Sequence, residues 1–95
     1  MSIESTLQSN IRKYLKGKGC YVLVIKPQPG IPDGCPDIIA FLEGMWLAIE
    51  VKAKPSSPYQ SLQRETLEKL HNWSWAKRVD PDIWPSIKAE LEMLL

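Results

Sequence analysis

The chain has 95 residues, of which 44% are hydrophobic, and its formal net charge is +1. This length supports one core, so we expect residues 1–95 to form a single domain without an accessory module. Two cysteines without CxxC spacing and a single histidine argue against a zinc cluster, a disulfide framework and Ser-His-Asp or Cys-His catalysis. The longest apolar run is too short to cross a bilayer, so we expect an intracellular protein with no membrane partner.

The first third of the chain predicts a helix, a strand and a stiff loop. Apolar residues recur at helical spacing behind Ser2, which can cap the helix, and Gly17 and Gly19 can end it. Residues 20–25 form a short apolar run that is typical of a strand covered on both faces. Four prolines exclude regular structure from residues 27–36.

A hairpin is predicted next. Residues 37–42 and 45–51 indicate two strands, and Glu43-Gly44 between them fits a two-residue turn. With that turn, the antiparallel register places Asp37 opposite Glu50 on one face of the sheet, with Cβ atoms about 5 Å apart.

The rest of the chain predicts a helix, a strand and a helix. Ser57 and Gln60 match a capping box, so we expect the second helix to begin at Pro58. Residues 75–79 indicate a fourth strand, and either Asp80-Pro81 or Trp84-Pro85 opens the last helix. The inward faces of the two helices are expected to carry Leu62, Thr66, Leu67, Leu70 and Trp73 in the first and Ile83, Ile87, Leu91 and Leu94 in the second. This order predicts an α/β fold with a central mixed sheet flanked by helices.

Strand alternation places Lys52 on the same face as Asp37 and Glu50. Two facing carboxylates with restricted solvent repel each other unless a cation lies between them. Oxygen ligands without histidine or thiolate favour Mg²⁺ or Mn²⁺, which can lower the pKa of a bound water and stabilise charge on a phosphoryl oxygen. Lys52 is then placed to orient or deprotonate that water, or to neutralise the developing charge. The alternative is a surface acidic pair that forms a salt bridge with Lys52.

Positive charge is concentrated near the amino terminus, because no acidic residue occurs from Ser5 to Pro32. We expect nucleic-acid phosphates to be contacted by the basic side chains of Arg12, Lys13, Lys16, Lys26 and Lys54. Alternatively, these side chains only solvate a helix and its flanking turns.

Pro36-Asp37, a hydrophobic hairpin and Glu50-Val51-Lys52 together resemble the PD-(D/E)xK motif of the restriction-endonuclease-like nuclease superfamily. Gly34-Cys35-Pro36-Asp37 resembles the G-x-P-D entry of its VRR-NUC family, and SPYQSLQRETLEKL resembles the segment that follows EVK there. The resemblance spans nearly the whole chain and is closest to stand-alone VRR-NUC domains of phage and bacterial type.

This resemblance implies a restriction-endonuclease-like fold and a metal-dependent active site. Asp37 and Glu50 match the metal-binding acids of the family. The backbone carbonyl of Val51 is then a further ligand, and Lys52 matches the catalytic lysine.

The resemblance also assigns roles outside the hairpin. Gln63 matches the family glutamine of the catalytic set, and Gln60 is the alternative. Glu4 resembles a first-helix glutamate that joins the metal site in many relatives, although it is equally explained as an ordinary charge at a helix N-terminus.

We therefore expect a Mg²⁺- or Mn²⁺-dependent DNA endonuclease in the cytoplasm of a bacterium or a phage-infected host cell. One active site per domain implies a homodimer for cutting two strands. The resemblance, which extends to archaeal junction resolvases of the same fold, favours four-way (Holliday) junctions, with flap or duplex DNA as alternatives. Two other interpretations are a nuclease-derived module that binds branched DNA without cutting it, and a protein-interaction domain whose tryptophans form a partner surface.

Overall fold

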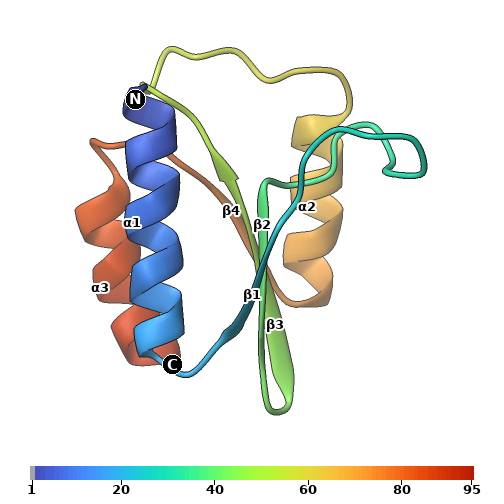
Figure 1. Ribbon diagram of the computed structural model, residues 1–95. Coiled ribbons are helices and arrows are strands. Elements are labelled where there is room, and N and C mark those ends of the chain that lie inside the picture. Colours follow the sequence, from blue (N-terminus) through green and yellow to red (C-terminus); the bar gives the residue numbers. More distant parts are fainter. Residues whose placement is uncertain (1) are drawn as a thin grey trace.

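The computed structural model describes residues 2–95, which form one four-stranded sheet between two layers of helix (Figure 1). The elements are α1 (Ile3–Gly17), β1 (Tyr21–Val24), β2 (Ile38–Leu42), β3 (Met45–Val51), α2 (Gln63–Trp73), β4 (Trp75–Val79) and α3 (Trp84–Leu94). The strands lie in the order β1-β2-β3-β4; the first two pairings are antiparallel, and β3 and β4 pair in parallel. The predicted α/β fold with a mixed central sheet is confirmed.

The helices cover the two faces of the sheet unequally. In Figure 1, α1 and α3 lie on one side of the sheet and α2 lies on the other. The larger core lies on the side of α1 and α3, where Ile11 and Leu91 pack with Ile49. On the other side α2 packs against β3 and β4, with Leu67 buried near Ala48.

The first helix begins and ends as its sequence predicts. The Ser2 Oγ accepts a hydrogen bond from the Ser5 N–H at 3.0 Å, which satisfies a free donor of the first turn. The helix ends at Gly17 after burying one stripe of apolar side chains. No helix among residues 2–95 is both long and apolar enough to cross a membrane.

The β2–β3 hairpin has the predicted register. Ile39 pairs with Ala48, so Asp37, just before β2, continues the ladder opposite Glu50. Ile39 and Ala48 pack on the α2 side of the sheet. Alternation along each strand therefore directs both acids to that side.

The second helix begins at Gln63 rather than at Pro58, and the capping box predicted at Ser57 is absent. Two groups of Ser57 are engaged in the preceding loop instead. Its Oγ accepts from the Lys54 N–H at 3.3 Å, and its carbonyl accepts from the Arg78 guanidinium. The local sequence pattern is therefore overridden by contacts within the loop and with β4.

The buried faces of α2 and α3 are shorter than predicted. The last helix begins at Trp84, the second of the two expected starts. Leu67, Ile87 and Leu91 are buried as expected. The predictions were wrong for four residues at the helix ends, which are each more than a third exposed: Leu62, Trp73, Ile83 and Leu94.

Candidate active site

The acidic pair lies at one end of the sheet, between two loops. Residues 25–37 lead from β1 into β2, and residues 52–62 lead from β3 into α2. Both loops lie at the end of the sheet where α1 begins (Figure 1). A cavity of about 470 Å³ is present here. Five residues predicted for the site line this cavity: Glu4, Asp37, Glu50, Lys52 and Gln63.

Asp37 is held by the strand that faces it. Its Oδ2 accepts a hydrogen bond from the Val51 N–H at 2.8 Å. Burial raises the pKa of the Asp37 carboxyl, the bond from Val51 opposes that rise, and the nearby Glu4 carboxylate adds to it. Among residues 2–95 only Oδ2 receives a hydrogen bond, so Oδ1 is available to a ligand.

Glu50 carries the main electrostatic conflict of the site. The residue is only 2% exposed, and burial, followed by repulsion from Asp37, raises its pKa to about 7. The Lys52 Nζ lies 3.4 Å from its Oε2. Its Oε1 is buried and has no hydrogen-bond partner among residues 2–95. Such an oxygen is costly to bury unless an external cation or donor binds it.

Gln63, the first residue of α2, connects the buried acid to the lysine. Its Nε2 donates to the Glu50 Oε2 at 2.8 Å, and its Oε1 accepts from the Lys52 Nζ at 2.8 Å. The same Oε1 accepts from the Gln60 N–H at 2.7 Å. Gln60 lines the cavity but joins these bonds through its backbone. The structure therefore places the side chain of Gln63, rather than that of Gln60, between the candidate catalytic groups.

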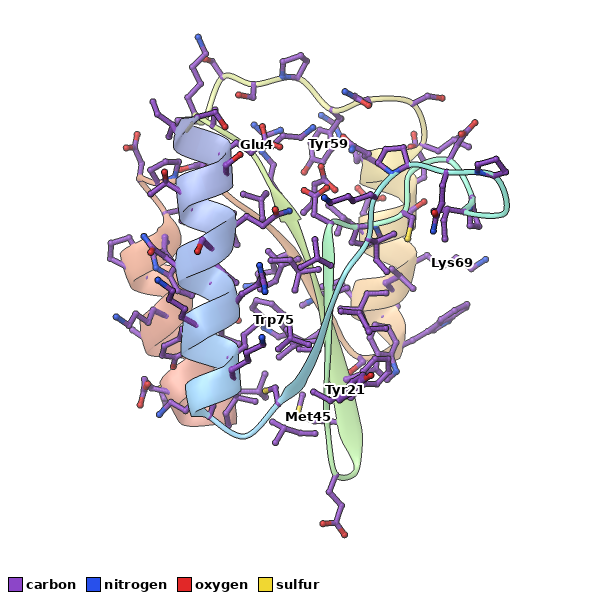
Figure 2. The ribbon with its side chains drawn as sticks, viewed as in Figure 1. Glu4, Tyr21, Met45, Tyr59, Lys69 and Trp75 are labelled. Carbon is purple, nitrogen blue, oxygen red and sulfur yellow. The ribbon has the colours of Figure 1, made fainter. Side chains whose placement is uncertain are left out.

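Glu4 lies at the rim of the site. It is exposed in the first turn of α1, at the end of the helix near the two loops (Figure 2). Its charge contributes to the raised pKa values of both Asp37 and Glu50. No group of three or more His, Cys, Asp or Glu side chains within residues 2–95 is arranged to hold a metal ion, so Glu4 does not form a closed ligand set with the pair.

The predicted phosphate-binding side chains lie in two different places. Lys26 and Lys54 belong to the two loops that border the cavity. Arg12, Lys13 and Lys16 are exposed in later turns of α1, which covers the opposite face of the sheet from the acids. Two of the five predicted cations therefore lie on the loops of the site.

Sequence analysis missed two arginines beside the site, Arg64 and Arg78. Arg78 pairs in register with Glu50 on the neighbouring strand. Its Nη2 donates to the carbonyls of Lys54 at 3.3 Å and Pro55 at 3.0 Å, in addition to the Ser57 carbonyl. Strand alternation alone could have assigned Arg78 to the α2 side, but the parallel pairing and the path of the loop are visible only in the structure.

The donor set at the acidic pair fits a hard divalent cation. Mg²⁺ usually takes one or two carboxylates from a protein and keeps waters and substrate oxygens at its other positions. The available oxygens of Asp37 and Glu50 match that requirement. Cys35 also lines the cavity, but burial raises the pKa of its thiol, which disfavours a thiolate ligand.

Residues 4–94, nearly the whole chain, match a family model described as archaeal Holliday junction resolvase (hjc). This family has the restriction-endonuclease-like fold, so the fold and the superfamily predicted from the sequence are confirmed. The matching family is this one rather than VRR-NUC. No curated protein and no solved structure gives a match.

Proposed function

This chain belongs to the archaeal Holliday junction resolvase family, and we propose that it is a Mg²⁺- or Mn²⁺-dependent endonuclease that cuts four-way DNA junctions in the cytoplasm. The observation that carries the proposal is the buried Oε1 of Glu50, which has no hydrogen-bond partner in the described chain, residues 2–95. Glu50 lies opposite Asp37 in a cavity shared with Lys52. A buried acid and a half-buried acid that face each other destabilise a fold, and a bound divalent cation relieves that conflict.

Each side chain of the site has a proposed task. A bound cation supplies activation of water and neutralises charge on phosphoryl oxygens. Asp37 and Glu50 would hold this cation through the oxygens that have no hydrogen-bond donor within residues 2–95. Lys52 places a positive charge and a proton at the reacting phosphate. Gln63 orients Lys52 and Glu50 through its amide and is a positioning residue.

The remaining predicted residues have peripheral tasks in this proposal. Glu4, at the rim of the cavity, and the backbone carbonyl of Val51 would be further ligands of the cation. Lys26 and Lys54 contact phosphates close to the cavity. A four-way junction extends well beyond a single site, so the basic side chains on α1 contact a more distant arm: Arg12, Lys13 and Lys16.

We propose that the chain acts as a homodimer, because it holds one site whereas resolving a junction requires two cuts. An apolar patch on β1 and β2 supports this pairing. It lies on the same side of the sheet as α2, but beyond the part that the helix covers. Tyr21, Leu23 and Phe41 are 70%, 38% and 42% exposed, and their register places them on one face. Covering such an apolar patch with a second copy is favourable.

Cleavage of end-labelled DNA tests the function directly. Wild-type protein and Lys52→Ala are compared on four-way junction, flap and linear duplex DNA with Mg²⁺ or Mn²⁺. We expect junction cutting by the wild type and a loss of about 100-fold or more in Lys52→Ala, with junction binding retained. Lys69→Ala, which removes an exposed lysine from α2, is the matched control.

The outcomes separate the alternative functions. Preferential cutting of flap or duplex DNA would contradict the proposed substrate but would still support a nuclease. Tight, salt-sensitive junction binding without cutting of any substrate would contradict the proposal and favour a non-catalytic branched-DNA-binding module.

A further inference from the structure

A second hollow lies beside the candidate active site, between α2 and β4. It measures about 770 Å³, and its walls include Tyr59, Arg64, His71 and Arg78. Tyr59 lines this hollow, whereas the next residue, Gln60, lines the catalytic cavity. The loop of residues 52–62 therefore contributes neighbouring side chains to both spaces. None of the tasks proposed above uses the side chains of this hollow.

Tyr59 gathers two guanidinium groups in the hollow. Those of Arg64 and Arg78 lie 5.0 and 4.8 Å from its ring centroid. The two positive charges are thus within about 10 Å of each other, close to one Debye length at physiological salt. Among residues 2–95 neither arginine forms an ion pair. Glu68 also lines the hollow, but it is not paired with either of them. Two like charges held this close, neither of them in an ion pair within residues 2–95, attract an anion.

Two side chains of the hollow, Arg78 and His71, are oriented by hydrogen bonds to the backbone. The Nη2 of Arg78 donates to three loop carbonyls. The Nη1 and Nε of the same guanidinium have no acceptor within residues 2–95. The His71 Nδ1 accepts from the Ala76 N–H at 3.1 Å, so a neutral ring carries its proton on Nε2. Donors that are already ordered lose little entropy when they bind a ligand.

We propose that this hollow is a second, non-catalytic binding site for the phosphodiester backbone of DNA, in which Arg64 and Arg78 hold phosphates of the strand that leaves the catalytic cavity. The inference rests on the proposed function and extends it. Arg78 pairs in register with Glu50, and neighbouring strands lie about 5 Å apart. A DNA strand that leaves the catalytic cavity across the loop of residues 52–62 therefore reaches the hollow. The planar guanidinium fork matches phosphate geometry.

Arg64→Gln tests this site, and Lys69→Gln is its matched control. Both residues are exposed on α2, and each variant removes one positive charge. Lys69 lies outside the hollow, on the outer side of α2 with its Nζ 5.1 Å from the Trp73 ring (Figure 2). Junction affinity is measured by fluorescence anisotropy in EDTA, at several salt concentrations between about 50 and 200 mM.

We expect Arg64→Gln to reduce the slope of log affinity against log salt by about 1, and to weaken binding about fivefold near physiological salt. Lys69→Gln is expected to keep the wild-type slope. Equal slopes for the two variants, with wild-type binding and cutting intact, would overturn this inference and leave the proposed function standing. Wild-type protein that neither binds nor cuts the junction would overturn both.

Discussion

The fold disfavours the charged form of the Glu50 carboxyl, which makes stability depend on pH. The pKa of this group rises from 4.5 to about 7 on folding. At pH values between these two, the folded chain therefore binds a proton that the unfolded chain has lost. The free energy of unfolding is consequently highest, with respect to this group, below the lower value, and it falls as the pH rises toward the upper one.

Glu50→Gln should therefore stabilise the metal-free protein at alkaline pH. We expect a gain in the free energy of unfolding of about 1 to 3 kcal/mol at about pH 8, and a much smaller gain at about pH 5. Urea unfolding in EDTA at the two pH values measures the difference. Glu43→Gln in the exposed hairpin turn is the control. A loss of stability in Glu50→Gln at the higher pH would show that the buried acid is not in conflict with the fold.

The two glutamines near the site provide a second prediction at the scale of single residues. Gln63→Ala removes the bonds to Lys52 and Glu50, and we expect single-turnover junction cleavage to slow about 10- to 100-fold with binding retained. Gln60→Ala keeps its backbone bond to Gln63 and should have a clearly smaller effect. Equal rates for the two variants would remove the positioning role of Gln63.

Most of the site could be predicted from the sequence because its geometry is local. The length of the Glu43-Gly44 turn and the alternation of strand residues were enough to bring Asp37, Glu50 and Lys52 together. That the Oε1 of Glu50 finds no partner among the described residues was not predictable, because it depends on which donors the later loop and α2 supply.

At the scale of elements, Gly34 is the point where the two loops of the site meet. Its φ is +82°, and a Cβ there would lie 2.6 Å from the carbonyl oxygen of Leu62. Leu62 immediately precedes α2 and itself has a φ of 65°. This close approach sets the loop before Asp37 against the start of the helix that carries Gln63.

Gly34→Ala should lower the free energy of unfolding by more than about 2 kcal/mol, because backbone strain and a steric clash act together. Gly30→Ala is the matched control, since Gly30 has a φ of +94° and a Cβ there would meet nothing within 4 Å. Strain alone should cost this variant about 1 kcal/mol. Equal losses in urea unfolding would mean that the loops adjust easily at Gly34.

The start of α2 shows why part of the fold could not be predicted. The pattern at Ser57 and Gln60 satisfies a local capping rule. However, Arg78 from β4 binds the Ser57 carbonyl, and Ser57 stays in the loop instead of capping a helix. The helix then begins at Gln63, whose own side chain accepts the Gln60 N–H. A contact with a strand that follows α2 in the chain thus decided the boundary, and no local pattern reports it.

At the scale of the whole molecule, the order of helices and strands was predictable but the use of their outer surfaces was not. Periodicity identifies an inward face for α1 without stating which side of the sheet it covers. The structure places its basic residues across the sheet from the acids, whereas Arg64 and Arg78 lie beside them. Charge counts along the chain therefore indicated the α1 surface but not the pair of arginines beside the acids.

The proposed homodimer is tested at this scale by sedimentation. We expect wild-type protein to sediment at twice the chain mass of 10.8 kDa, because the apolar face of β1 and β2 needs a cover. Phe41→Glu should shift the protein toward the monomer. Trp73→Glu, which changes an exposed aromatic residue at the end of α2, should not. A wild-type monomer at micromolar concentration would contradict the dimer.

Mn²⁺ binding by the metal-free protein tests most directly whether Asp37 and Glu50 hold a divalent cation. Electron paramagnetic resonance follows the titration at about pH 8, where the Glu50 carboxyl is ionised. We predict a Mn²⁺ site in the wild type and in the control Glu43→Gln, and its loss in Glu50→Gln. Identical weak binding by all three proteins would contradict a metal site at the acidic pair, and with it the proposed nuclease.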